Sequence, residues 1–77
     1  MSEFDTAFDT VLAGIKNGDF DEKDTLKGGE MQGIERLKNT FGELRKYDTC
    51  TEEKISYLIT EWGKRQDTLA RIKQHRR

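Results

Sequence analysis

The chain has 77 residues, with 14 Lys and Arg against 15 Asp and Glu, one His, one Cys and no Pro. Charged residues make up 38% of the sequence and hydrophobic residues 32%, so the chain is limited to one small domain. No apolar stretch approaches the roughly 20 residues that a membrane span needs, and the acidic start is unlike a signal peptide. Cys50 alone excludes an internal disulfide framework, so we expect a cytoplasmic protein.

The apolar content predicts a thin core. Ile, Leu, Val and Phe together number 16, which is close to the composition of disordered chains, but the net charge of −1 favours folding. A core in a chain of this length rarely supplies more than about 3–5 kcal/mol. We therefore expect the protein to gain stability from a protein partner or by forming a homo-oligomer.

The first helix is predicted at residues 3–16. Apolar side chains recur there with the spacing of one helix face: Phe4, Ala7, Phe8, Val11, Leu12 and Ile15. Ser2 followed by Asp5 is typical of a helix start, and Asn17-Gly18 is typical of a helix end. The stripe predicts that this helix buries one face, and we expect Phe8 to be one of its core aromatic residues.

Two further helices are predicted after a polar, glycine-containing acidic loop at residues 17–30. One spans residues 31–47, and the other spans residues 50–74 with Thr49 and Glu52 as its capping box. The apolar spacing in both approximates a heptad, and the short connection between them favours an antiparallel helical hairpin. The predicted fold is all-α, a small three-helix unit in which the N-terminal amphipathic helix packs on this hairpin.

The charges are segregated along the chain. Residues 1–30 carry a balance of −5, whereas residues 62–77 carry six bases against one acid, a balance of +5. One interpretation is an electrostatic footprint for a partner at the C-terminal end. The other is that the two ends neutralise each other inside the fold, and the spacing does not decide between them.

Residues 58–73 resemble the second half of a helix-turn-helix. The resemblance rests on a turn glycine followed by Thr-Leu-x-Arg-Ile: Gly63, Thr68, Leu69, Arg71 and Ile72. It implies a DNA-binding regulator whose recognition helix enters the major groove. Lys64 departs from the motif, because an apolar residue normally fills the turn. The competing interpretation is one continuous amphipathic helix, in which Gly63 is an ordinary helix residue.

Two other features are weaker candidates for chemistry. Residues 19–30 resemble a degenerate EF-hand loop, but Lys23 stands at a ligand position and Asp24 stands where the loop needs Gly. We therefore expect a solvated acidic loop, with no metal or other cofactor. Cys50 and His75 each lack a second catalytic or ligating residue nearby in sequence, so we expect no enzymatic activity.

The sequence thus predicts a non-enzymatic helical protein that docks on another macromolecule. In size and charge it is similar to small proteins that phages and mobile elements encode. We expect a protein partner, with nucleic acid as the alternative through the basic C-terminal end, and no membrane contact. Trp and Arg dominate binding energy at interfaces, which selects these partner-binding residues: Trp62, Lys64, Arg65, Arg71, Lys73, Arg76 and Arg77.

Overall fold

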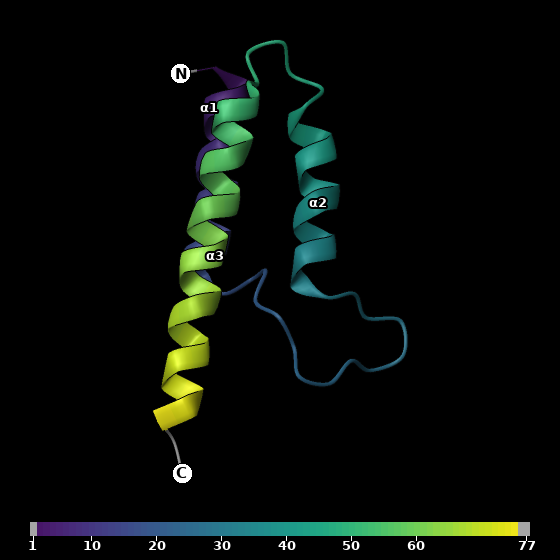
Figure 1. Cartoon of the computed structure of the whole chain (residues 1–77). Coiled ribbons are helices and arrows are strands. Elements are labelled where there is room, and N and C mark those ends of the chain that lie inside the picture. Colours follow the sequence, from purple (N-terminus) through teal and green to yellow (C-terminus); the bar gives the residue numbers. More distant parts are fainter. Residues whose placement is uncertain (1, 76–77) are drawn as a thin grey trace.

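The computed structural model describes residues 2–75, which form three α-helices and no strand. Helix α1 spans Glu3–Asn17, α2 spans Gly33–Leu44 and α3 spans Glu52–His75. The predicted all-α class is therefore confirmed. A long connector, residues 18–32, joins α1 to α2, and a short one joins α2 to α3 (Figure 1).

The helices lie roughly along one axis, with α2 antiparallel to the other two. Figure 1 shows that α1 and α3 run in the same direction side by side, while α2 runs the opposite way. The predicted second and third helices are thus antiparallel in direction, but the main packing partner of α3 is α1. Because α3 has 24 residues and α1 only 15, the last turns of α3 extend past the rest of the molecule.

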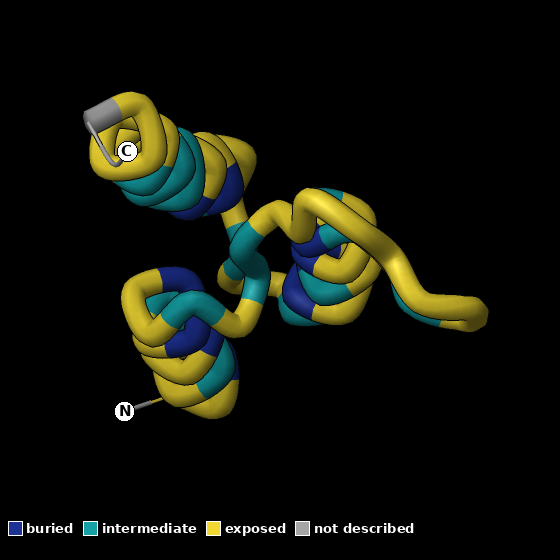
Figure 2. The backbone as a smooth tube through the Cα atoms, turned by 90° about the horizontal axis from the view of Figure 1, so that it is seen from below, coloured by how far each residue is buried: buried dark blue, intermediate teal, exposed yellow. Residues whose placement is uncertain are grey.

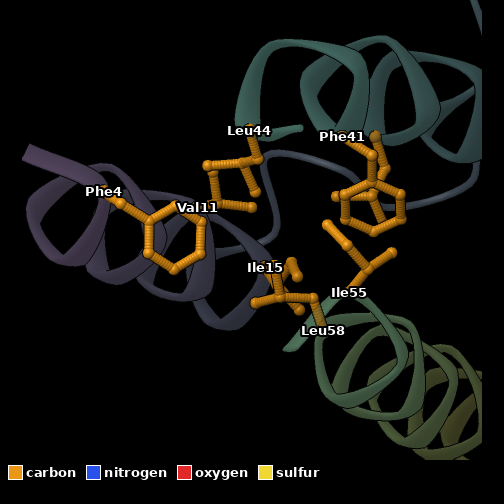
Figure 3. Packing of buried hydrophobic residues seen from close by; sticks show 8 residues of the cluster. Phe4, Val11, Ile15, Phe41, Leu44, Ile55 and Leu58 are labelled. Carbon is orange, nitrogen blue, oxygen red and sulfur yellow. The ribbon is translucent and has the colours of Figure 1, made fainter. Parts of the chain in front are cut away.

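The core lies between the three helices, and the buried positions of each helix face inward in Figure 2. Eight buried hydrophobic side chains form it (Figure 3): Phe4, Val11 and Ile15 from α1, Leu37, Phe41 and Leu44 from α2, and Ile55 and Leu58 from α3. Burying an aliphatic or Phe side chain fully contributes about 1.5–3 kcal/mol. The fold therefore depends on a few contacts from each helix.

The α1 stripe is only partly as predicted. Ala7, Phe8 and Leu12 are half-buried at the edge of the core, so the expectation of Phe8 as a core aromatic is wrong. Its ring stacks instead on exposed Tyr57 of α3, with ring centroids 6.1 Å apart. Phe4, one turn earlier, is the aromatic residue that α1 buries, at 1% exposure.

The ends of α1 follow the predicted signals. The Ser2 hydroxyl accepts from the Asp5 main-chain N–H at 3.1 Å, and the Asp5 carboxylate accepts from the Ser2 N–H in return. Gly18 ends the helix with φ of 93°, a left-handed conformation that glycine adopts without steric cost.

The ends of α2 and α3 differ from the predictions. Helix α2 is two residues shorter at its start and three at its end than the predicted 31–47, and turns occupy residues 45–49. Helix α3 begins at Glu52, because the hydroxyl of Thr51 rather than that of Thr49 accepts from an N–H of its first turn, that of Lys54. The predicted capping box at Thr49 is therefore wrong.

Candidate functional site: the acidic strap on α3

The candidate site is the junction between the start of the connector and the second half of α3. Residues 18–24, which we call the strap, turn back from the end of α1 and run along α3. Main-chain hydrogen bonds start this turn, from the Asp19 N–H to Gly14 O at 2.9 Å and from the Asp21 N–H to Gly18 O at 3.2 Å. The left-handed Gly18 thus directs the strap onto α3.

Phe20 marks the point where all three helices meet the strap. Its main-chain oxygen accepts a 2.7 Å hydrogen bond from the Trp62 indole Nε1 of α3. A β-carbon added at Gly33, the first residue of α2, would lie 1.9 Å from the same oxygen. The Arg36 guanidinium of α2 lies 5.6 Å from the centre of the Phe20 ring and donates to Asp19 O at 2.7 Å. The strap therefore contacts both α2 and α3, in addition to continuing the chain from the end of α1.

Asp21 carries the strongest polar contact of the junction. Its two carboxylate oxygens accept from Nε and Nη2 of Arg65 at 2.7 and 2.8 Å, and Oδ1 also accepts from Gln66 Nε2 at 2.8 Å. Arg65 donates a further hydrogen bond to Lys16 O, in the last turn of α1, at 3.1 Å. Such two-pronged pairing fixes geometry as well as charge. Arg65 thereby holds both the strap and the end of α1.

The ion pair shifts the ionisation of both partners. The hydrogen bond from Arg65 lowers the pKa of Asp21 below its usual value, against an opposing effect of burial, and Gln66 contributes in the same direction as Arg65. The hydrogen bond to Asp21 correspondingly raises the pKa of Arg65. The Asp21 side chain is 25% exposed and the Arg65 side chain is 31% exposed, so solvent screens the pair only in part.

The outer half of the strap, residues 22–24, is held by Gln32 at the start of α2, whose side chain binds the Lys23 N–H and C=O at 2.9 Å, and by exposed contacts with α3. The Glu22 N–H donates to Gln66 Oε1 at 3.0 Å, and both carboxylate oxygens of Asp24 accept from Lys73 Nζ at 2.8 Å. The side chains of this last pair are 84% and 60% exposed. Ion pairs that exposed typically contribute 0 to about 1 kcal/mol.

A groove of about 940 Å³ opens between residues 21–24 and α3. Its α3 side carries Trp62, Leu69, Ala70 and Ile72, flanked by charged and polar side chains. A second hollow of about 390 Å³ lies on the other flank of Leu69 and Ile72, next to Lys16 at the end of α1. These two side chains therefore form an apolar ridge between two hollows.

The structure gives the predicted partner-binding residues different surroundings. Trp62 and Arg65 are half-buried and bonded to the strap, so their polar groups are already used within the chain. The others in the described part are exposed, and each faces a carboxylate: Lys64 that of Glu61 at 3.2 Å, Arg71 that of Asp67 at 3.2 Å, and Lys73 that of Asp24. Arg76 and Arg77 lie outside the described residues.

The helix-turn-helix prediction fails at its turn. Helix α3 runs from Glu52 to His75 without interruption, so Gly63 is an ordinary helix residue with open space around it. Of the two interpretations of the segregated charges, the contacts of Arg65 with Asp21 and of Lys73 with Asp24 support mutual neutralisation within the fold.

The first part of the acidic connector differs from the expected solvated loop, whereas residues 22–29 are exposed as expected. Asp21 and Asp24 face Arg65 and Lys73, and Glu30 pairs with Lys23, so these carboxylates bind cationic side chains. The first part is a strap on α3 rather than a solvated loop. Within residues 2–75 no group of three or more His, Cys, Asp or Glu side chains is placed to hold a metal ion. Cys50 is a half-buried free thiol beside the core.

Sequence reasoning missed Phe20, Gln66 and Gly33 as parts of the junction. Phe20 gave one signal, because it is the only aromatic residue in the predicted polar connector. Gly33 gave none beyond its helix-weakening effect, since its role depends on a strap that approaches from 13 positions earlier in the chain.

Comparisons with protein families, with curated proteins and with solved structures found no significant match. None of the helices in the described part combines the length and the apolar character needed to cross a membrane. The functional conclusion therefore depends on the surface of the molecule itself.

Proposed function

We propose that this protein is a small non-enzymatic interaction protein that binds another protein through the distal α3 surface. We define that surface as the apolar ridge of Leu69 and Ile72 with the surrounding cations Lys64, Arg71 and Lys73. The observation that carries the proposal is that α3 continues beyond the end of α1 (Figure 1) and carries the apolar residues Leu69 and Ile72 in its last turns.

The seam has heptad spacing from one end of α3 to the other: Ile55, Leu58, Trp62, Arg65, Leu69 and Ile72. Its first two residues are buried at 2% and 0% exposure, and the next two contact the strap. Leu69 is half-buried and Ile72 is 50% exposed, and neither belongs to the core. A partner helix or segment that continued the packing would cover these two side chains.

The charge around the ridge favours an acidic partner. Residues 62–77 have a balance of +5 in the sequence, and the contacts from Asp21, Asp24 and Glu61 reduce the effective balance to +2. Electrostatic complementarity at the rim of an interface speeds association and selects partners. We therefore propose a protein partner that offers apolar side chains and carboxylates together.

The test compares two exposed apolar positions. Ile72→Asp places a charge on the ridge, and Leu26→Asp places the same charge on the connector, where the native side chain is 41% exposed. Neither position belongs to the core, so both variants should fold like the wild type. A partner recovered from source-cell extract by the wild type and by Leu26→Asp, and lost with Ile72→Asp, supports the proposal. Equal recovery by all three proteins contradicts it.

Duplex DNA is the competing partner. A protein that contacts several phosphates binds random duplex with micromolar affinity, and that affinity falls steeply as salt increases. With each described cation of the surface facing a carboxylate, we expect little binding at physiological salt. Micromolar binding to random duplex DNA that salt abolishes, and that Ile72→Asp leaves unchanged, would identify DNA rather than a protein as the partner.

Self-association through another face is a separate part of the proposal. Among the described residues the core holds eight buried hydrophobic side chains, and a hollow of about 380 Å³ between α1 and α2 adjoins Val11, Leu44 and Tyr47. We propose that the protein forms a homo-oligomer that adds to this small core. Light scattering on a size-exclusion column tests it directly, and a monomer at micromolar concentration contradicts it.

A further inference from the structure

We infer that the Asp24 carboxylate, in the outer half of the strap, is a displaceable internal competitor, which an acidic segment of the partner replaces on Lys73 of α3. The inference rests on the proposed function, because it concerns the same distal α3 surface. It adds the chemical class of the bound segment and a contact within the chain that weakens binding.

The side chains of the two halves of the strap are held to α3 by contacts of different exposure. Phe20 and Asp21 are held by Trp62, Arg65 and Gln66 through hydrogen bonds of 2.7 to 2.8 Å, and Gly33 packs directly on the Phe20 main chain. The main chain of exposed residues 22–24 is also held, by Gln32, which binds the Lys23 N–H and C=O at 2.9 Å, and by the Glu22 N–H bond to Gln66. The Asp24 side chain has only its exposed ion pair with Lys73. The Asp24 carboxylate can therefore leave Lys73 while the main chain of the strap stays in place.

The contacts of the outer half show which chemistry this part of α3 accepts. A carboxylate of Asp24 occupies Lys73, yet the strap leaves the apolar side of the groove open at Leu69, Ala70 and Ile72. A segment that carries a carboxylate for Lys73 and an apolar side chain for the groove makes both contacts. The strap makes only the first, so such a segment has an advantage over it.

A second copy of the chain fits this surface poorly. Two distal α3 surfaces face to face would bring like charges together, since each has an excess of bases. An acidic segment from a different protein avoids this repulsion.

The experiment uses a fluorescent peptide with the sequence of residues 19–26 (DFDEKDTL) and, as its control, the same peptide with each Asp or Glu replaced by its amide. Both are titrated into the wild type, into Asp24→Ala and into Glu43→Ala. Glu43 is an equally acidic and exposed position on α2, so its variant changes net charge by the same amount without touching the strap.

The removal of Asp24 frees Lys73, so the acidic peptide should bind Asp24→Ala about twofold to fivefold more tightly than either other protein, the range expected for an exposed ion pair. The amide peptide should show no such difference. If Asp24→Ala and Glu43→Ala bind the acidic peptide with equal affinity, the proposed internal competition is overturned, whereas the proposed docking on α3 is not. The absence of binding to all three proteins would contradict the proposed function as well.

Discussion

A β-carbon at Gly33 would stand 1.9 Å from the main-chain oxygen of Phe20, a distance that no real side chain tolerates. The first residue of α2 and the centre of the strap are thus in main-chain contact. The same oxygen accepts the Trp62 hydrogen bond from α3. One peptide group of the connector therefore sets the spacing between α2 and α3, which otherwise make few contacts with each other.

Alanine should have opposite effects on stability at Gly33, which makes this contact, and at Gly63, which lies in open space. Gly33→Ala should destabilise the fold by about 2 kcal/mol or more, because main-chain atoms must move to admit the methyl group. Gly63→Ala should stabilise it by about 0.5–1 kcal/mol, because alanine favours a helix and nothing lies within 4 Å. Thermal unfolding followed by circular dichroism measures both. Destabilisation by Gly63→Ala would restore the predicted turn at that position.

The ion pair at Asp21 should contribute more to stability than the one at Asp24. Asp21→Ala leaves a half-buried Arg65 without its carboxylate, and we expect a loss of about 1–2 kcal/mol. Asp24→Ala removes an exposed pair and should cost less than about 1 kcal/mol. Urea unfolding of the two variants beside the wild type compares them. Equal losses would mean that the strap is held evenly along its length.

Acid should remove the contribution of the Asp21 carboxylate to the free energy of unfolding. Its pKa in the folded protein lies below the 3.8 of an unperturbed Asp, because Arg65 stabilises the carboxylate. The stabilisation is therefore complete above the unfolded pKa and is lost as the pH falls through the lower, folded pKa. The stability gap between the wild type and Asp21→Asn should be constant above about pH 5 and narrow below pH 3.8. A gap that is independent of pH from 5 to 2 would show that the charge of Asp21 does not matter.

Trp62 should contribute to stability through the hydrogen bond of its indole N–H as well as through its buried apolar surface. Trp62→Phe keeps an aromatic ring at the edge of the core and removes the donor to Phe20 O, at an expected loss of about 1 kcal/mol or more. Tyr57→Phe on the same helix is the control, because its native side chain is 47% exposed. Thermal unfolding should shift clearly for the first variant and little for the second.

Local signals in the sequence predicted the local features well. Ser2 with Asp5 predicted the start of α1, Gly18 predicted its end, and the apolar spacing predicted three helices. Each signal acts within a few residues, where capping and helical periodicity are decided. The exchange of Thr49 for Thr51 as the cap of α3 is an error of two residues between similar side chains.

The junction could not be predicted in this way, because its contacts join distant positions. Asp21 and Arg65 are 44 residues apart, and nothing in the alternation of charges identifies them as a pair. Trp62 looked like an exposed anchor for a partner because basic residues surround it in sequence. It is half-buried because the strap crosses it, and that path depends on Gly18 and Gly33 together.

Amide hydrogen exchange along α3, measured by NMR on the full chain, tests the central claim most directly. The account predicts strong protection from Ile55 through Gln66, Gly63 included, because the core and the strap cover that stretch. It predicts much weaker protection after Leu69, where residues 70–74 are all exposed. Rapid exchange around Gly63, or protection that continues undiminished past Ile72 in the isolated protein, would contradict a continuous helix with an uncovered docking surface.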